Sequence, residues 1–324
     1  MYYYVYIKNL IIFIIMNTKY DTICMSGGGI KGFSFIGALK YLEDNNHINM
    51  SDINHYIGTS AGSMTSFFLS LDYSLKEIKD FILGFNFTKL IPEFNIENVL
   101  VNHGIDNGDK LMFLIMNFLK EKYDVDDVTF MEHYNLTNKK LTIIGTNYTK
   151  NCEEVFNYIN TPNMSVRLAI RISISVPIVF TPVLYNNNYY VDGGVINNFP
   201  MNHCNPMTTL GIYIKNGSVQ KMENILTLFS GCLNILTDTI STKHFFHLDN
   251  YNIIEIEDYN AGLTDFDVNT KHKEDIINLG IKYAEKFLKE YNEKKEMVKI
   301  EKNKESSTQT DTTKITQDSS TQTD

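Results

Sequence analysis

The sequence of 324 residues has only four cysteines and no excess of basic side chains. The four, at Cys24, Cys152, Cys204 and Cys232, are widely spaced and form no CxxC pair, which gives no support for a zinc knuckle or a disulfide framework and indicates a reducing compartment. The net charge of −9 argues against a nucleic-acid partner, because phosphate binding depends on clustered Lys and Arg. No HExxH or comparable cluster is present, so no metal site is expected.

A long hydrophobic run is also absent from the amino terminus. The apolar stretch 1–16 is interrupted at Lys8 and Asn9, and its unbroken part, 10–16, is shorter than the roughly 20 residues that span a bilayer. It has no basic start and no small-residue cleavage site, so we expect a cytoplasmic protein and no secretion. Two interpretations of residues 1–19 stay open: an interfacial anchor, or an extension upstream of a protein that begins at Met16.

Composition divides the rest of the chain into a folded part and a polar tail. Hydrophobic residues make up 43% and charged residues 21%, as in ordinary globular proteins. After about residue 295 the sequence becomes rich in Lys, Glu, Ser, Thr and Gln, and the hexapeptide SSTQTD occurs at 306–311 and again at 319–324. We therefore predict a catalytic domain over residues 20–295 and a disordered tail over 296–324.

Strand and helix patterns alternate within the predicted domain. A buried strand at 20–25 leads through a glycine-rich turn into a helix, and a second strand at 55–57 leads through a sharp turn into the apolar segment 64–71. Further strand patterns lie at 141–146, 189–191, 210–214 and 251–256, and further helix patterns at 111–119 and 276–288. This alternation predicts the α/β class, as a three-layer α/β/α sandwich with a central, mostly parallel sheet.

The strongest local signal is the GTSAG segment at 58–62, which matches G-x-S-x-G between a strand pattern and a helix pattern. A nucleophile elbow needs Gly58 and Gly62 because its strained backbone leaves no room for side chains. That turn holds a serine hydroxyl clear of the sheet. Ser60 is therefore the candidate nucleophile.

A glycine-rich turn at 26–32 follows the first strand, where backbone N–H groups and a helix N-terminus make an anion site. One use of Gly27, Gly28 and Gly29 is an oxyanion hole, whose donors stabilise the charge that develops during acyl transfer. The other use is nucleotide binding, because the turn also satisfies G-x-G-x-x-G through Gly32. The acid that this second use needs, Asp52, precedes its strand instead of ending it, which disfavours a dinucleotide.

A serine nucleophile needs a base, and the segment Asp192-Gly193-Gly194 offers one at the end of a predicted strand. In an open α/β sheet this carboxyl edge is where ligands bind, and Ser60 lies at the same edge. The ordinary alternative is a plain Asp-Gly turn.

Histidine is the competing base, because a Ser-Asp-His triad would place its histidine downstream of Asp192. The histidines there are in undistinguished settings: His203, His244, His247 and His272. A triad esterase and a nucleotide-binding or non-catalytic scaffold protein are the two alternatives that the residues leave open.

Together, SGGGIKG at 26–32, GTSAG at 58–62 and DGG at 192–194 resemble the three signatures of the patatin-like phospholipase family. The segment SISVPIVFTP at 173–182 is similar to the family's S-x-A-x-P-x-x-F-x-P, with Ser175 in place of the usual alanine. The resemblance covers about residues 20–290 and excludes both ends.

The resemblance implies a lipid acyl hydrolase of the phospholipase A type with a catalytic dyad. Ser60 would attack the acyl ester carbonyl, Asp192 would accept its proton, and the backbone of Gly27 to Gly29 would hold the oxyanion. Lys31 would order the turn or meet a phosphate head group. No calcium or other cofactor is implied; the partner is a phospholipid or related lipid ester, with peripheral membrane contact.

A direct Ser–Asp pair makes a physical demand on the aspartate. A carboxyl with its reference pKa of about 3.9 is a weak base for a hydroxyl proton. We therefore expect burial at the sheet edge to raise the pKa of Asp192.

Overall fold

The computed structural model describes residues 19–90, 96–216, 225–245, 252–258 and 268–318. Residues Lys19–Ala284 form one compact unit, and the chain from Glu285 onward belongs to a second. Residues 1–18, for which an interfacial anchor and an upstream extension are the two interpretations, lie outside the described residues. The candidate site and the fold described below belong to the first unit.

A central sheet organises this unit, and its strands pair in the order β10-β9-β1-β2-β4-β8-β7. Strands β2 and β8 pair with successive parts of one edge of β4, and β5 pairs with its other edge. Neighbours among β10, β9, β1, β2 and β4 are parallel, whereas β5, β7 and β8 pair antiparallel. The strands are β1 (Thr22–Met25), β2 (His55–Thr59), β4 (Lys140–Asn147), β5 (Cys152–Phe156), β7 (Val183–Tyr185), β8 (Asn188–Asp192), β9 (Thr209–Asn216) and β10 (Asn252–Asp258). The predicted α/β class with a mostly parallel sheet is confirmed.

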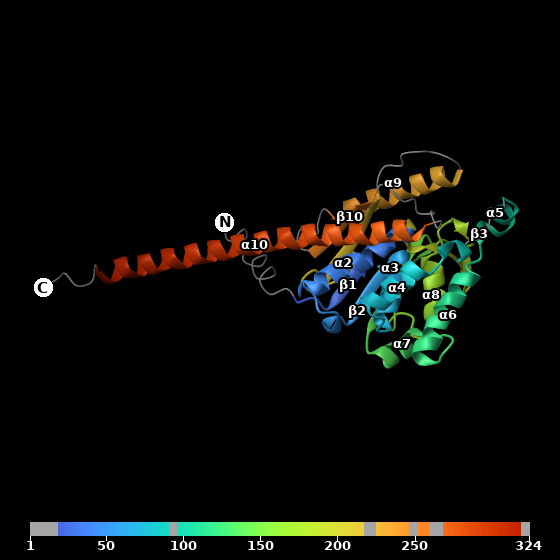
Figure 1. The fold of residues 1–324 in the computed structure, drawn as a ribbon, viewed down its shortest axis with the longest axis horizontal. Helices are drawn as coiled ribbons and strands as arrows, with labels where there is room; N and C mark the ends of the chain where they lie inside the picture. Colours follow the sequence, from blue (N-terminus) through green and yellow to red (C-terminus); the bar gives the residue numbers. More distant parts are fainter. Residues whose placement is uncertain (1–18, 91–95, 217–224, 246–251, 259–267, 319–324) are drawn as a thin grey trace. The chain divides into compact units, whose positions relative to one another are not determined.

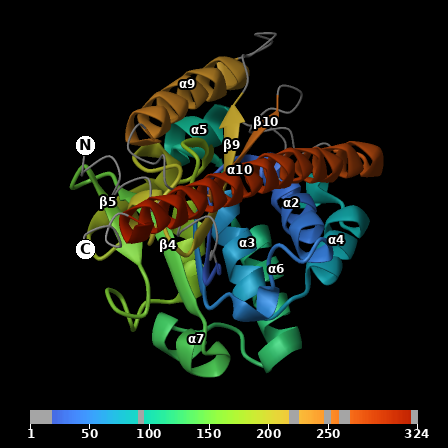
Figure 2. The ribbon, with the colours of Figure 1, turned by 90° about the vertical axis from the view of Figure 1, so that its left-hand side faces the viewer.

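Helices flank the sheet (Figure 1). They are α2 (Phe33–Asp44), α3 (Ala61–Ser70), α4 (Leu75–Gly84), α5 (Ile96–Asn102), α6 (Asp109–Tyr123), α7 (Phe130–Thr137), α8 (Val166–Ser173) and α9 (Ile225–Phe245). A further helix, α10 (Thr270–Asp318), belongs to this unit as far as Ala284. Parallel crossovers are right-handed, and the strand order reverses at β1, so α9 covers the opposite face from α2 and α3 (Figure 2). A separate parallel pair joins β3 (Gly104–Asp106) to β6 (Ile178–Phe180).

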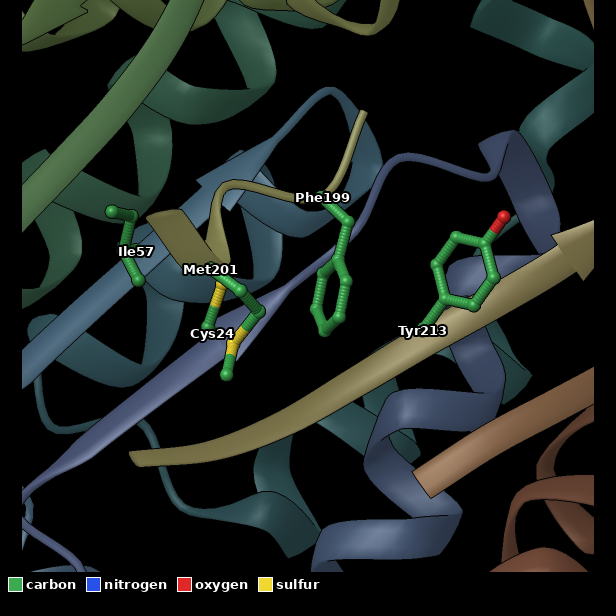
Figure 3. Close-up of a cluster of buried hydrophobic side chains, with 5 residues drawn as sticks. All are labelled: Cys24, Ile57, Phe199, Met201 and Tyr213. Atoms are coloured by element: carbon green, nitrogen blue, oxygen red, sulfur yellow. The ribbon is translucent and has the colours of Figure 1, made fainter. Parts of the chain in front are cut away.

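One face of the sheet carries a buried cluster that holds the chain after Asp192 in place (Figure 3). Cys24 on β1, Ile57 on β2 and Tyr213 on β9 pack against Phe199 and Met201. The Tyr213 hydroxyl also donates to an α9 carboxylate, 2.8 Å away. The cluster therefore anchors the segment that follows the DGG motif to three parallel strands.

Helix α10 extends further than the sequence predicts. It continues to Asp318, so residues 296–318, for which we expected disorder, are helical, and residues 319–324 lie outside the described residues. Lys and Glu, which are frequent in residues 296–305, are strong helix formers, and the more Ser- and Thr-rich residues 306–318 continue a helix instead of having to nucleate one. Across the described ranges we find no helix with the length and apolarity that a membrane-spanning segment requires.

Candidate active site

Ser60 lies in a strained turn between β2 and α3. Its backbone has φ 53° and ψ −120°, a conformation that non-glycine residues rarely adopt. A Cβ on Gly62 would come within 2.3 Å of the Met25 carbonyl oxygen, and one on Gly58 equally close to the backbone of Gly62. Both flanking glycines are thus required by close backbone approach, and Ser60 sits where a nucleophile elbow would hold it.

The pairing of β4 brings Ser60 and Asp192 together. Thr59, the last residue of β2, pairs with Ile144, and Asp192, the last residue of β8, pairs with Gly145. Since β5 occupies the other edge of β4 at both positions, β2 and β8 lie on the same edge. Running in opposite directions, they meet head to head at their carboxyl ends, and this meeting makes the two side chains neighbours.

The Asp192 carboxyl is almost completely buried, with 5% of the residue exposed. Its Oδ1 accepts the Gly194 N–H at 2.7 Å, whereas Oδ2 has no hydrogen bond of good geometry. Burial raises the pKa of Asp192 to about 7, although the neighbouring Ser60 hydroxyl and the Gly194 N–H lower it in part. Oδ2 is thus the carboxyl oxygen left without a hydrogen bond, and catalytic hydrogen bonds commonly tighten when substrate binds.

This raised pKa predicts a pH-dependent gain in stability for Asp192→Asn. A folded-state pKa above the unfolded value near 3.9 favours the neutral carboxyl, so stability present at low pH is lost as pH rises towards 7. The amide does not ionise. The free energy of unfolding of Asp192→Asn, relative to that of the unchanged chain, should therefore increase by about 2–3 kcal/mol between pH 5 and pH 8.5. Urea unfolding at the two pH values measures this difference. The exposed Asp80→Asn is the control, and an equal effect of Asp192→Asn at both pH values would contradict the prediction.

The glycine-rich turn differs from the expectation in one donor. The Gly27 N–H already donates to the Asn198 carbonyl at 3.0 Å, so it is engaged within the fold. Gly28 and Gly29 line the cavity together with Ser60, so their amides are the candidate donors for an oxyanion. A Cβ on Gly28 would come within 2.6 Å of a side-chain atom of Ile214, which keeps this position small.

Lys31 is directed to the sheet. Its side chain is buried, and Nζ lies 3.4 Å from the carbonyl oxygen of Asp258 at the end of β10. This contact fits a role of Lys31 in ordering the turn better than a role in binding a phosphate head group.

Gly32 allows the turn to pack on α3, because a Cβ there would lie 2.9 Å from Cβ of Ala61. Gly193 has a similar role, since its Cβ would be 2.3 Å from the Ile144 carbonyl oxygen.

Ser173 supports the elbow and was not singled out as a functional residue from the sequence. Its fully buried Oγ accepts the backbone N–H of Ser60 at 2.9 Å. The signal for it was the segment 173–182, of which it is the first residue. Ser175, which replaces the family's usual alanine there, accepts from Arg171 at 2.5 Å, and Arg171 also donates to the Thr181 carbonyl.

A cavity of about 180 Å³ opens at Ser60. Its walls come mainly from α3, α4, α6, the segment 174–180 and α9, and they are mostly apolar: Met64, Phe68, Ile78, Phe81, Ile82, Phe87, Leu90, Leu111, Leu114, Ile174, Val176, Val179, Phe180 and Leu233. Asp192 is the one charged side chain among the described residues that line it. A buried carboxylate that lines a mostly apolar cavity together with a serine hydroxyl is suited to proton transfer away from water.

The Ser-Asp-His triad would need a histidine at this cavity. No histidine is among its described lining residues. His203 bonds instead to Glu153 at 2.7 Å, and His272 lies at the start of α10. The side chain of His244 and the whole of His247 lie outside the described part.

The dinucleotide alternative also lacks its acid. Asp52 lies in a 3₁₀ turn before β2, where it pairs with Lys19 at 3.4 Å. Because β1 and β2 are parallel, this position is at the opposite edge of the sheet from the glycine-rich turn. In the described part we also find no group of three or more His, Cys, Asp or Glu side chains placed to hold a metal ion.

Comparison with known proteins matches residues 23–204 to the model of the patatin-like phospholipase family. A probable lipid hydrolase, 463L of Invertebrate iridescent virus 6, is 30% identical over 248 residues, which cover 74% of this chain and 79% of that protein. The uncharacterized protein YqhO of Bacillus subtilis is 25% identical over 292 residues, 82% of this chain and 97% of that one. Among solved structures, VipD from Legionella pneumophila has a TM-score of 0.61 at 16% identity, covering 84% of this chain and 67% of that chain, a likeness of fold alone.

The fold and the matches together define a hydrolase built on a mixed α/β scaffold. More specifically, the chain belongs to the patatin-like phospholipase family. The matched region runs from β1 to just past the DGG motif, so it contains all three motifs from which the family resemblance was drawn.

Proposed function

We propose that the protein is a lipid acyl hydrolase that cleaves fatty-acyl esters with a Ser60–Asp192 dyad. The observation that supports this proposal is the head-to-head meeting of β2, which precedes the strained turn at Ser60, and β8, which ends at a buried carboxyl with a pKa of about 7. A base with a pKa near the working pH is best suited to proton transfer.

In the proposed acylation step, Ser60 Oγ forms a bond to the ester carbonyl carbon while its proton passes to Asp192 Oδ2. The carbonyl oxygen becomes an oxyanion, for which the Gly28 and Gly29 N–H groups are the nearby donors. Collapse of this intermediate breaks the ester C–O bond, and the leaving alcohol takes the proton from Asp192. Water then attacks the acyl-enzyme, giving its proton to Asp192, and the fatty acid leaves as Ser60 recovers the proton.

The walls of the cavity support a fatty-acyl substrate. The apolar side chains contributed by α3, α4 and α6 would bury an alkyl chain, at a gain of about 0.8 kcal/mol per methylene group. The family and the viral relative named as a probable lipid hydrolase also favour a lipid ester. We accordingly propose phospholipids or related acyl esters as substrates, met by peripheral contact with a membrane surface in the cytoplasm.

Fatty-acid release tests this proposal directly. The full chain is incubated with phosphatidylcholine vesicles and, separately, with a triacylglycerol emulsion, each with and without a chelator. We expect release from at least one of these lipids, unchanged by the chelator because the dyad needs no metal. Absence of release from both lipids and from p-nitrophenyl butyrate would contradict the proposal.

A further inference from the structure

A second unpaired polar atom lines the cavity besides the one in the dyad. Buried polar atoms in native proteins almost always have a hydrogen-bond partner. Two buried side-chain oxygens at this cavity have none: Oδ2 of Asp192 and Oδ1 of Asn234. The first is the proton acceptor of the proposed reaction. The second has no part in that reaction, and it belongs to a residue that lines the cavity.

Asn234 is positioned by α9, the helix that covers the other face of the sheet. The residue is only 7% exposed, and Leu233 and Thr237 from the same helix line the cavity with it. The Thr237 hydroxyl donates to the backbone carbonyl of Asn234 at 3.1 Å, so it does not reach the side-chain oxygen. Helix α9 also contacts the 3₁₀ turn Gly193–Val195 that follows Asp192.

A second polar side chain, that of Asn198, also lines the cavity. Asn198 is 8% exposed, and its Oδ1 lies 2.3 Å and 2.8 Å from where Cβ atoms of Gly27 and Gly194 would be, so both glycines make room for it. The polar part of the lining is thus formed largely by the segment 192–198 and α9, whereas α3, α4 and α6 supply most of the apolar part. This division suits an ester with an apolar acyl side and a polar, hydroxyl-bearing alcohol side.

We propose that Asn234 accepts a hydrogen bond from a free hydroxyl next to the scissile ester. Its ligand class is therefore a partly acylated glyceride, either an uncharged monoacylglycerol or a lysophospholipid. This inference rests on the proposed function and adds a preference among its substrates. A site with a buried acceptor discriminates against an analogue that leaves the acceptor unpaired, since an unmade buried hydrogen bond costs about 1–3 kcal/mol.

Binding of ether lipids tests the subsite without catalysis. Octyl glyceryl ether and its phosphocholine derivative have no acyl ester, so they bind without being cleaved, and each is compared by calorimetry with its O-methylated counterpart. For the unchanged chain we expect the hydroxyl form to bind about 10-fold more tightly. In Asn234→Leu, which keeps the size and removes the acceptor, this ratio should fall to about 1.

Ile235→Ala is the matched control, because Ile235 is the next residue on α9 and is 67% exposed. It should keep the ratio of the unchanged chain. A ratio above 1 for only one ether pair would support the subsite and identify the lipid source. A ratio near 1 for the unchanged chain, an Asn234→Leu ratio equal to it, or no binding of either ether would overturn the subsite. Because Ser60→Ala should bind these ethers normally, failure of the dyad would leave this result unaffected.

Discussion

Ser60→Ala is expected to lower kcat by at least about 10⁴-fold, because the acyl-enzyme can no longer form. The residual rate would come from substrate binding and from the N–H donors at Gly28 and Gly29, which remain in place. Hydrolysis of p-nitrophenyl butyrate measures the effect, since its product is detected directly and the substrate does not titrate. Thermal unfolding of the same variant checks that the elbow still folds.

Ser66→Ala is the matched control for that experiment. Ser66 lies on the same helix, α3, and its buried hydroxyl has no hydrogen-bond partner and does not line the cavity. Its loss should leave kcat unchanged. Activity of Ser60→Ala close to that of Ser66→Ala would remove Ser60 from the reaction, and a comparable loss in His203→Ala would instead favour the triad esterase.

The pH dependence of kcat/KM should show a single acid limb with an apparent pKa of about 7. Asp192 must be ionised to accept the Ser60 proton, and burial raises its pKa to about 7. Activity is therefore expected to fall about tenfold for each pH unit below this value and to level off above it. An aspartate with its ordinary pKa near 3.9 would instead keep activity constant down to about pH 5.

The temperature dependence of that limb separates a carboxyl from an imidazole. A carboxyl ionises with almost no enthalpy change, so its pKa should stay constant between 10 and 35 °C, whereas the pKa of an imidazole falls on warming. His55 and His133 do not account for the limb, because desolvation lowers the pKa of each to about 4. A limb that moves with temperature, or activity retained by Asp192→Asn, would contradict the dyad.

The sequence predicted the positions of Ser60 and Asp192 at one edge of the sheet because each follows a strand pattern. It did not predict how they meet. The strand that ends at Asp192, β8, runs antiparallel to β4 and pairs with the same edge of β4 as β2 does. This arrangement depends on the register of strands that are far apart in the chain. Strand patterns identify a strand and its ends, but they carry no information on its direction or its neighbours.

Other features depended on long-range packing in the same way. The Gly27 N–H is bonded to Asn198, and Asn234 reaches the cavity only because α9 packs back over the sheet. Neither contact has a local signature. Helix α10 shows a different limitation, because the polar composition of residues 296–318 suggested disorder although residues 296–305 are rich in Lys and Glu, which are good helix formers.

Covalent labelling tests the central claim most directly. An alkyl fluorophosphonate reacts only with a serine that has been activated by a base, and its alkyl chain suits the apolar cavity. After labelling at pH 8, peptide mass spectrometry should locate the phosphonyl group on Ser60, and Asp192→Asn should react far more slowly. A label on another serine, or labelling of Ser60 at the same rate in Asp192→Asn, would contradict the Ser60–Asp192 dyad.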